Sequence, residues 1–346
     1  MIILGIETSC DETALAILEC SGGIASPRFK ILKEAVASQV AIHRPFGGVV
    51  PNLAKREHLA NLPVLERQIF GTGATAEKLW KKIDTIAVTV GPGLEPALWA
   101  GITFAQELAK KHKKTLIGAN HLEGHLYSFL LPGTTGRRPG TPLSKILPAA
   151  ALIVSGGHTI LLRVQNLKKW KRLGETRDDA VGEAFDKVAR LLDLPYPGGP
   201  ALSRLAESGR QGAIEFPQPM LHTRDYDFSF SGLKTAVLYY LKNNPKADKA
   251  DVATAFEHAA TGVLATKAFR AAKEIGARSI LLSGGVAANT RLRRHIGAAA
   301  RKLGVAFLVA PRRYNTDNAV MIAAAGYMSL LRGKKLPLRA KGQLAI

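Results

Sequence analysis

Cysteine is almost absent from this sequence of 346 residues, which contains only Cys10 and Cys20. Two cysteines cannot form a disulfide framework in a chain of this size, so we expect a reducing compartment. No apolar run reaches the roughly 18 residues needed to cross a membrane. Residues 1–7 lack a basic segment and a cleavage site, and they are interpreted as a first strand rather than a leader. These absences predict a cytoplasmic protein that does not enter a membrane.

Acidic residues are scarce compared with basic ones. The chain has 27 Asp and Glu against 48 Lys and Arg, a formal net charge of +21. Such an excess attracts polyanions and favours nucleic acid as a partner over a generic basic surface. Lysines and arginines are dense in 290–302 and 332–341, which are the leading candidates for phosphate-contacting segments.

The hydrophobic pattern predicts an α/β protein made of two similar lobes, because the chain is too long for one typical core. A strand, a small polar turn and a second strand open the sequence, and the same order recurs at 149–164. We expect a first lobe of 1–118 plus 317–346, a second lobe of 119–316, and a cleft between these copies. The basic tail after residue 331 is expected to be loosely held. Strands are predicted at 2–6, 13–18, 31–40, 83–90, 115–119, 149–154, 159–164, 279–282 and 305–310, and helices at 52–68, 97–110, 290–302 and 317–331.

Two histidines, His121 and His125, lie four residues apart. In a helix both imidazoles would project from one face, which is a usual way to hold one metal ion. Zinc proteases with this spacing have Glu directly after the first histidine, whereas here Leu122 follows and Glu123 comes one position later. The protease base is therefore missing. The spacing by itself is equally compatible with a metal site and with capping or core histidines.

Small polar turns follow hydrophobic strands at 5–13 and at 154–159. Turns of this kind bind phosphate through backbone N–H groups, and glycine allows a ligand to approach closely. Together with a metal, they indicate chemistry on a nucleotide-like substrate. Cys10 lies in the first turn, but no histidine near it in sequence supports a nucleophilic role, so it is interpreted as a buried small residue.

Ten short motifs together resemble the TsaD family, formerly called glycoproteases, which makes N6-threonylcarbamoyladenosine in tRNA. The resemblance covers the chain from residue 3 to about residue 327. The motifs are GIETSCDETA (5–14), GGVVP (47–51), GPGL (91–94), NHLEGH (120–125), VSGGHT (154–159), GEAFDKVARLL (182–192), YPGGP (196–200), FSFSGLKTA (228–236), SGGVAAN (283–289) and TDNAVMIA (316–323).

The resemblance implies a fold and a reaction. The fold is the duplicated lobe of actin, hexokinase and the heat-shock ATPases. The reaction transfers a threonylcarbamoyl group from threonylcarbamoyl-adenylate to N6 of the adenosine beside the anticodon, in tRNAs that read codons beginning with A, and AMP leaves. One divalent metal is expected, Fe²⁺ before Zn²⁺.

The bacterial branch of the family matches best. Archaeal and eukaryotic members carry Tyr at the position of Ile153 and Asn at that of His158, and archaeal members carry an acid at that of Ser203. Helper proteins similar to TsaB and TsaE are therefore the expected partners, beside tRNA and threonylcarbamoyl-adenylate.

For the metal, the resemblance implies His121, His125 and Asp317 as ligands, although Asp317 would open the last helix and could equally cap it. Among the acids of the first turn, Asp11 is ranked first as the general base that accepts the proton of the adenosine amine, with Glu12 as the other candidate.

For the nucleotide, the turn formed by 153–157 is expected to face phosphate or carbamoyl oxygens through its backbone. Asp186 would accept from ribose hydroxyls, Gly199 would let the nucleotide lie against bare backbone, and Asn289 would bond adenine or ribose. The alternatives are a salt bridge of Asp186 with a neighbouring lysine and an N-cap role for Asn289. The residues of the turn are Ile153, Val154, Ser155, Gly156 and Gly157.

Two other functions compete with the transferase. The first is a metalloprotease, which the older family name implies, and the second is an ATPase-like platform that binds partners. The missing protease base argues against the first, and the second leaves the metal site without use.

Overall fold

The computed structural model describes residues 1–138 and 140–346. This part of the chain divides into two compact units: unit 1 contains Met1–Thr134 and Thr316–Ile346, and unit 2 contains Thr135–Asn315. The expected division after residue 118 differs from this one. Helix α5 (His121–Tyr127) packs against α11 (Ala319–Leu331) and therefore belongs to unit 1.

Unit 1 is built on a five-stranded sheet with the strand order β3-β2-β1-β4-β5. An antiparallel meander is formed by β1 (Ile2–Glu7), β2 (Glu12–Ser21) and β3 (Arg28–Ser38). β4 (Thr85–Gly91) pairs parallel to β1, and β5 (Thr115–Asn120) pairs parallel to β4. The acidic turn at 8–11 therefore lies between the first two strands.

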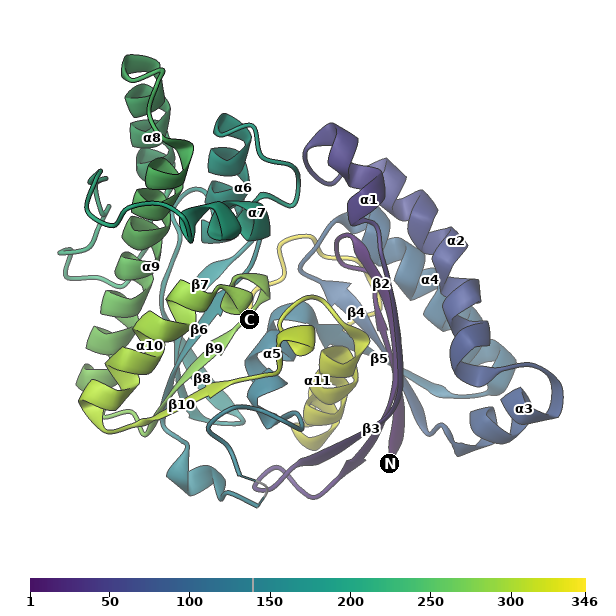
Figure 1. The fold of residues 1–346 in the computed structure, drawn as a ribbon. Helices are drawn as coiled ribbons and strands as arrows, with labels where there is room; N and C mark the ends of the chain where they lie inside the picture. The colour runs from purple at the N-terminus through teal and green to yellow at the C-terminus, as the bar shows by residue number, and fades with distance from the viewer. Residues whose placement is uncertain (139) are drawn as a thin grey trace. The chain divides into compact units, whose positions relative to one another are not determined.

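Helices cover both faces of this sheet, as Figure 1 shows. Leu4 and Ile6 point to one face, where they share a core with α2 (Pro51–Phe70) and α4 (Glu95–His112). Gly5, between them, faces α11, and a Cβ at this glycine would lie 2.2 Å from the carbonyl oxygen of Ala319. Glycine at this position therefore lets α11 approach the sheet backbone. The remaining short helices of unit 1 are α1 (Val40–His43), α3 (Gly73–Lys82), η1 (Arg44–Phe46) and η2 (Ser128–Leu130).

Unit 2 repeats the topology of unit 1. Its sheet has the order β10-β9-β6-β7-β8. β6, β7 and β8 again form an antiparallel meander, β9 pairs parallel to β6, and β10 pairs parallel to β9. This repetition confirms the predicted duplicated fold. The strands are β6 (Ala149–Val154), β7 (Thr159–Asn166), β8 (Lys169–Glu175), β9 (Ser279–Ser283) and β10 (Ala306–Val309).

Between β8 and β9, unit 2 has the four α-helices α6, α7, α8 and α9. The longest of them, α9 (Lys249–Glu274), is packed by buried alanines and by Phe256 into the main core of the unit. No helix in the described parts of the chain combines the length and the apolar character needed to span a membrane. The other helices of unit 2 are α6 (Val181–Leu191), α7 (Gly198–Ala206), α8 (Ser231–Asn243), α10 (Thr290–Leu303), η3 (Leu143–Lys145), η4 (Gly285–Ala288) and η5 (Arg312–Tyr314).

The tail after α11 is held against unit 1, so the prediction of a loose tail is wrong. Ala340 is buried in the core that contains α2 and α4. The backbone N–H of Lys341 donates to the carbonyl of Val90 over 2.9 Å, and the Asn120 amide donates to the carbonyl of Ala345 over 2.9 Å. Sequence composition indicated only that the tail is basic, and it could not indicate these long-range partners.

Candidate functional site

Three side chains of unit 1 form a group with the geometry of a metal site. One ligand atom each of His121, His125 and Asp317 lies within 4.8 Å of the others. Nε2 of His121 is 3.4 Å from Oδ1 of Asp317, and Nε2 of His125 is 3.2 Å from the same oxygen. The two imidazole rings are nearly perpendicular, at 88°, with centroids 4.7 Å apart. The spacing of four residues on α5 therefore brings both rings to one carboxylate.

The position of Asp317 corrects one expectation. It does not open the last helix, because α11 begins at Ala319 and its N-cap is Asn318, whose side chain accepts from the N–H of Met321 over 2.9 Å. The cap function that competed with metal binding is thus performed by the neighbouring residue. Asp317 itself points its carboxylate at the two histidines.

The chemistry of these donors fits a divalent metal. Among the described residues, Nδ1 of His125 is buried without a hydrogen-bond partner, and Nε2 contacts Oδ1 of Asp317 at 3.2 Å. Buried polar atoms usually have partners, so this imidazole suits the binding of an ion. Burial lowers the pKa of His125, which favours the neutral form that metals bind. Burial would raise the pKa of Asp317, but the histidines outweigh it and hold this pKa well below its usual range, so the carboxylate is charged. Two neutral nitrogens and one carboxylate leave positions open for substrate oxygens.

A second carboxylate contacts the ring nitrogen of His121 that does not face Asp317. Glu7, at the end of β1, is fully buried, and its Oε2 lies 3.1 Å from Nδ1 of His121. The same oxygen accepts from the hydroxyl of Thr89 over 2.7 Å, and the N–H of Ser9 donates to the other oxygen. Burial lowers the pKa of His121, but Asp317 and Glu7 outweigh burial and raise this pKa well above its usual value. The sequence did not indicate this contact, because the strand alternation alone does not show which acid meets the histidine.

The other groups of the first turn differ from one another. Asp11 is buried, and Glu12 begins β2 and is partly buried. Burial, and then the nearby charges of Asp11 and Asp317, raise the pKa of Glu12 well above its usual value. Burial and Asp11 likewise raise the pKa of the Cys10 thiol, which disfavours the thiolate and agrees with its interpretation as a non-nucleophilic residue.

In unit 2 the predicted phosphate turn is shorter than expected. Ile153 and Val154 are not in the turn but in β6, with their side chains in the core. The turn itself begins at Ser155, whose N–H donates to the carbonyl of His158 over 2.8 Å. Gly156 and Gly157 are exposed, and a Cβ added to either would meet nothing within 4 Å. Protein packing therefore does not require glycine there, whereas close approach of a ligand would.

The carboxylate of Asp186 accepts hydrogen bonds from the backbone of α7. Its Oδ1 accepts from the N–H of Gly198 over 2.8 Å and from that of Gly199 over 3.1 Å. Both donors belong to the first turn of α7, whose backbone N–H groups have no helical partner. Asp186 on α6 thus fixes the start of α7.

Asn289 connects three helices. Its Oδ1 accepts from the N–H of Leu292 over 2.7 Å and so caps α10, as the alternative interpretation predicted. Its Nδ2 donates to the hydroxyl of Ser203 on α7 over 2.9 Å and to the carboxylate of Glu257 on α9 over 2.6 Å. Glu257 also accepts from Nε of Arg291 over 2.8 Å. Sequence reasoning missed Glu257, because nothing local in α9 marks it.

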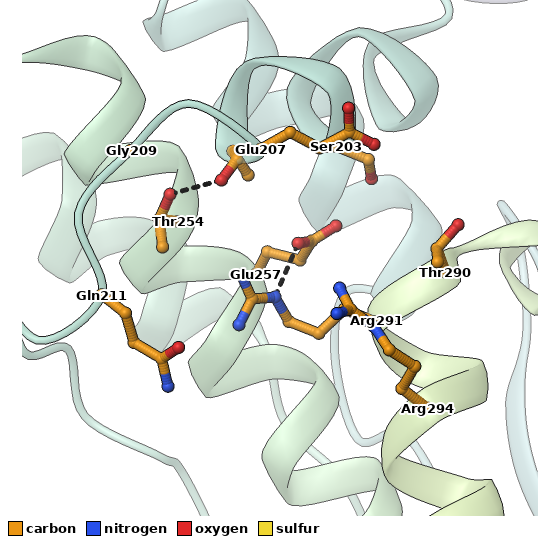
Figure 2. Close-up of a pocket in the computed structure, with 10 residues that line it drawn as sticks. Ser203, Glu207, Gly209, Gln211, Thr254, Glu257, Thr290, Arg291 and Arg294 are labelled. Carbon is orange, nitrogen blue, oxygen red and sulfur yellow. Dashed lines mark hydrogen bonds and ion pairs between the residues drawn. The ribbon is translucent and has the colours of Figure 1, made fainter.

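A pocket of about 300 Å³ lies among α7, α9 and α10 (Figure 2). Ser203 and Glu257, the two partners of the Asn289 amide, both line it. Figure 2 shows the Glu257–Arg291 ion pair at its wall, with Arg294 one turn further along α10. Two residues that are distant in sequence thus hold α7: Asp186 binds its start, and Asn289 binds Ser203 within it. The full lining is Ser203, Ala206, Glu207, Gly209, Gln211, Thr254, Glu257, Thr290, Arg291 and Arg294.

Solved structures support the fold. The chain resembles the activator of 2-hydroxyisocaproyl-CoA dehydratase from Clostridium difficile, with a TM-score of 0.52 and 14% identity over 96% of both chains. It also resembles HypF from T. kodakarensis, with a TM-score of 0.57 and 15% identity over 96% of this chain and 48% of that one. These likenesses confirm the actin- and hexokinase-like architecture and indicate nothing further at this level of identity.

Sequence relatives identify the family. The family model of TsaD, tRNA N6-adenosine threonylcarbamoyltransferase, matches residues 30–324. The protein of that name from Thermosipho melanesiensis is 48% identical over 94% of this chain and 94% of its own length. The one from Moorella thermoacetica is 47% identical over 97% of this chain and 94% of its own length. The chain belongs to the TsaD family of tRNA N6-adenosine threonylcarbamoyltransferases.

Proposed function

We propose that this chain transfers a threonylcarbamoyl group to N6 of an adenosine in tRNA. Its membership of the TsaD family is the observation that carries this proposal. We further propose threonylcarbamoyl-adenylate as the donor, the adenosine beside the anticodon of tRNAs reading codons that begin with A as the acceptor, and AMP as the leaving product. Since tRNA is the substrate, the cytoplasm is the proposed location.

The metal proposed for unit 1 is Fe²⁺, with Zn²⁺ as the alternative. Two histidines and one carboxylate with open positions are the donor set typical of Fe²⁺ centres, and Zn²⁺ accepts the same ligands. His121, His125 and Asp317 would hold the ion, which when bound polarises an oxygen of the acyl donor. Glu7 orients His121 by accepting from Nδ1, which leaves Nε2 directed at the ion.

The acids of the first turn are the proposed proton acceptors. The adenosine amine is a poor nucleophile because its lone pair is delocalised into the ring, so loss of its proton must accompany attack. Asp11 and Glu12 remain the candidates for this general base. Burial and the charge of Asp11 raise the pKa of Glu12, which makes its ionised form a stronger proton acceptor than an ordinary carboxylate.

Unit 2 is proposed to bind the nucleotide part of the donor. The pocket beside Asn289 offers hydroxyls, two carboxylates and two guanidinium groups to a base and ribose. The exposed N–H groups at Gly156 and Gly157 are proposed to face phosphate or carbamoyl oxygens. Asp186 and Gly199 would act by holding the start of α7 in place.

Helper proteins similar to TsaB and TsaE are proposed as partners. Ile153 and His158 match the bacterial branch of the family, and this match supports bacterial-type helpers.

The competing metalloprotease finds no support in the geometry. The only acid inside the histidine motif, Glu123, is fully buried and paired with Arg332 and Lys334. A carboxylate bound to two cations is a poor base and has no access to water. The platform hypothesis lacks support from the named relatives, which are transferases.

Incubating the chain and its helpers with tRNA and threonylcarbamoyl-adenylate tests the proposal. Mass spectrometry of nucleosides from the digested tRNA should detect threonylcarbamoyladenosine, and AMP should accumulate in equal amount. Unmodified adenosine in every position, with both substrates and the metal present, would overturn it. A peptide substrate in parallel provides the protease control.

A further inference from the structure

Helix α5 makes two separate sets of contacts. His121 and His125 meet Asp317, whereas Glu123, roughly 200° further around the helix than His121, points elsewhere. The Glu123 carboxylate is completely buried and accepts from Nη1 of Arg332 over 2.8 Å and from Nζ of Lys334 over 2.6 Å.

The residues that meet Glu123 belong to the end of α11. Arg332 directly follows the last residue of this helix, and Asp317 comes two residues before its first. Nη1 of Arg332 also donates to the hydroxyl of Tyr127 over 3.1 Å, at the end of α5. Side chains beside both ends of α11 therefore contact α5: the Asp317 carboxylate at the start and the Arg332 guanidinium at the end.

Further contacts fix the start of α5. Asn120 caps the helix by accepting from the N–H of Glu123 over 3.1 Å, and its Nδ2 donates to the carbonyl of Ala345 in the tail. Gly124 packs against Met321 and Ile322 of α11, where a Cβ would come within 3.1 Å of the Met321 side chain. Close helix packing and a buried ion cluster thus act on the same short helix.

We propose that Glu123, Arg332 and Lys334 form a positioning cluster that sets the distance between the histidine pair and Asp317. None of these three side chains is proposed to touch metal or substrate. A buried carboxylate requires its cationic partners, so α5 cannot slide or rotate along α11 without losing them. The cluster thereby preorganises the ligands, as outer groups around a metal site commonly do. This inference rests on the metal centre proposed for unit 1.

The test is metal binding by the full-length chain, made metal-free by dialysis against a chelator. Cobalt(II) is the probe, because its visible spectrum reports ligand geometry and chelator competition gives its affinity. Glu123→Gln keeps the size of the side chain but removes its charge. We expect Co²⁺ affinity to fall by about 10- to 100-fold, with an altered spectrum.

Asp251→Asn is the matched control in unit 2. Asp251 is also a buried carboxylate, only 4% exposed, and is paired with the guanidinium of Arg210. The Asp251→Asn variant should have a lower melting temperature but the same Co²⁺ affinity and spectrum as the parent. Lys334→Met removes one of the two cations, so it should change the Co²⁺ affinity and spectrum in the same direction by a smaller amount. It is the second variant, for use if Glu123→Gln yields too little folded protein.

The outcomes separate the two proposals. If Glu123→Gln and Lys334→Met melt earlier but bind Co²⁺ with the affinity and spectrum of the parent, the cluster is only structural and the inference is wrong. If the parent itself binds no Co²⁺, the metal centre is wrong and the inference fails with it. Weaker binding and a changed spectrum in the Glu123 and Lys334 variants, but not in Asp251→Asn, would support it.

Discussion

Units 1 and 2 share one sheet topology but carry different chemistry on it. The turn between the first two strands is acidic in unit 1, with Asp11 and its neighbour Glu12, and rich in glycine in unit 2, with Gly156 and Gly157. The helix between the fourth and fifth strands has no side-chain cap in unit 1, where its N-cap is Leu94. In unit 2 the same position is occupied by Asn289, which joins that helix to α7 and α9.

This comparison shows that the two units share the sheet topology and differ in their turns and helices, where both proposed sites lie. Unit 1 places buried acids next to histidines, as a metal requires. Unit 2 places hydroxyls, an amide and guanidinium groups around a pocket, as a nucleotide requires. If the two units have separate roles, a substitution in one unit should leave the binding property of the other unchanged.

The largest effect is expected in unit 1. Asp317→Ala should remove the bound metal and nearly all transferase activity, because two histidines alone hold a divalent ion weakly. Metal content of the purified variant, measured by inductively coupled plasma mass spectrometry, checks this. AMP binding by calorimetry is the control and should persist, since the proposed nucleotide pocket lies in unit 2. Full metal occupancy in the variant would show that the ligand assignment is wrong.

The second effect concerns unit 2. Asp186→Ala and Asn289→Ala should each weaken binding of an adenylate analogue by about 1–3 kcal/mol, the cost of a lost buried hydrogen bond. The two losses should be non-additive, because both residues hold α7. Titration calorimetry on the single and double variants measures this.

A helix-cap variant provides the control for unit 2. Asp248→Ala removes the N-cap of α9, which accepts from the N–H of Ala250 over 2.8 Å. It should cost about 1 kcal/mol of stability without changing analogue affinity. Parent-like affinity in both Asp186→Ala and Asn289→Ala would place the nucleotide elsewhere.

The third prediction concerns pH in unit 1. The raised pKa of His121 keeps it protonated above its usual range in the metal-free chain, so a metal must displace this proton. Metal affinity should therefore rise up to tenfold per pH unit, and keep rising above pH ~6.5, the usual histidine pKa. Chelator competition at several pH values measures the slope. Glu7→Gln removes one cause of the raised pKa of His121, so the metal affinity of this variant should stop rising at a lower pH than that of the parent. An unchanged pH profile would show that Glu7 does not raise the pKa of His121.

The same shifts set the stability of the metal-free chain. The raised pKa of His121 contributes stability that is present below its unfolded pKa and is lost as pH rises through the folded value. The lowered pKa of Asp317 contributes stability that is present above its unfolded pKa and is lost as pH falls through the folded value.

The smallest effect is expected for tRNA binding. Arg301 and Lys302 are exposed on α10, whereas Arg291, Arg332 and Lys334 are engaged with buried carboxylates. Part of the basic sequence is therefore structural. Replacing Arg301 or Lys302 by Ala should reduce the salt dependence of tRNA binding by about one unit of log–log slope each. Lys30→Ala, an exposed lysine paired with Glu19, is the control, and identical slopes for all variants would remove α10 from the interface.

Local pattern predicted most of the strands and the duplication, but it missed β8 and the helices α6 to α9. Alternating and continuous apolar runs located the other strands to within a few residues, and the repeated strand–turn–strand unit indicated the duplication. Local patterns could not indicate contacts between residues that are far apart in the chain. Spacing indicated that His121 and His125 share a face, but no local feature shows that Glu7 meets His121 or that Glu123 meets Arg332.

Two errors have the same origin. Ile153 and Val154 adjoin a glycine turn in sequence, yet their side chains belong to a buried strand. Asp317 is a good helix cap by residue type, yet Asn318 performs that role. In both places the residue type fits two neighbouring positions, and only tertiary contacts decide between them.

Anomalous diffraction from crystals grown with Fe²⁺ and AMP tests the division of chemistry between the units most directly. The account predicts an iron peak about 2.0–2.2 Å from Nε2 of His121, Nε2 of His125 and a carboxylate oxygen of Asp317. It also predicts AMP density in the pocket formed by α7, α9 and α10. An iron peak away from these three side chains, or AMP bound outside unit 2, would contradict it.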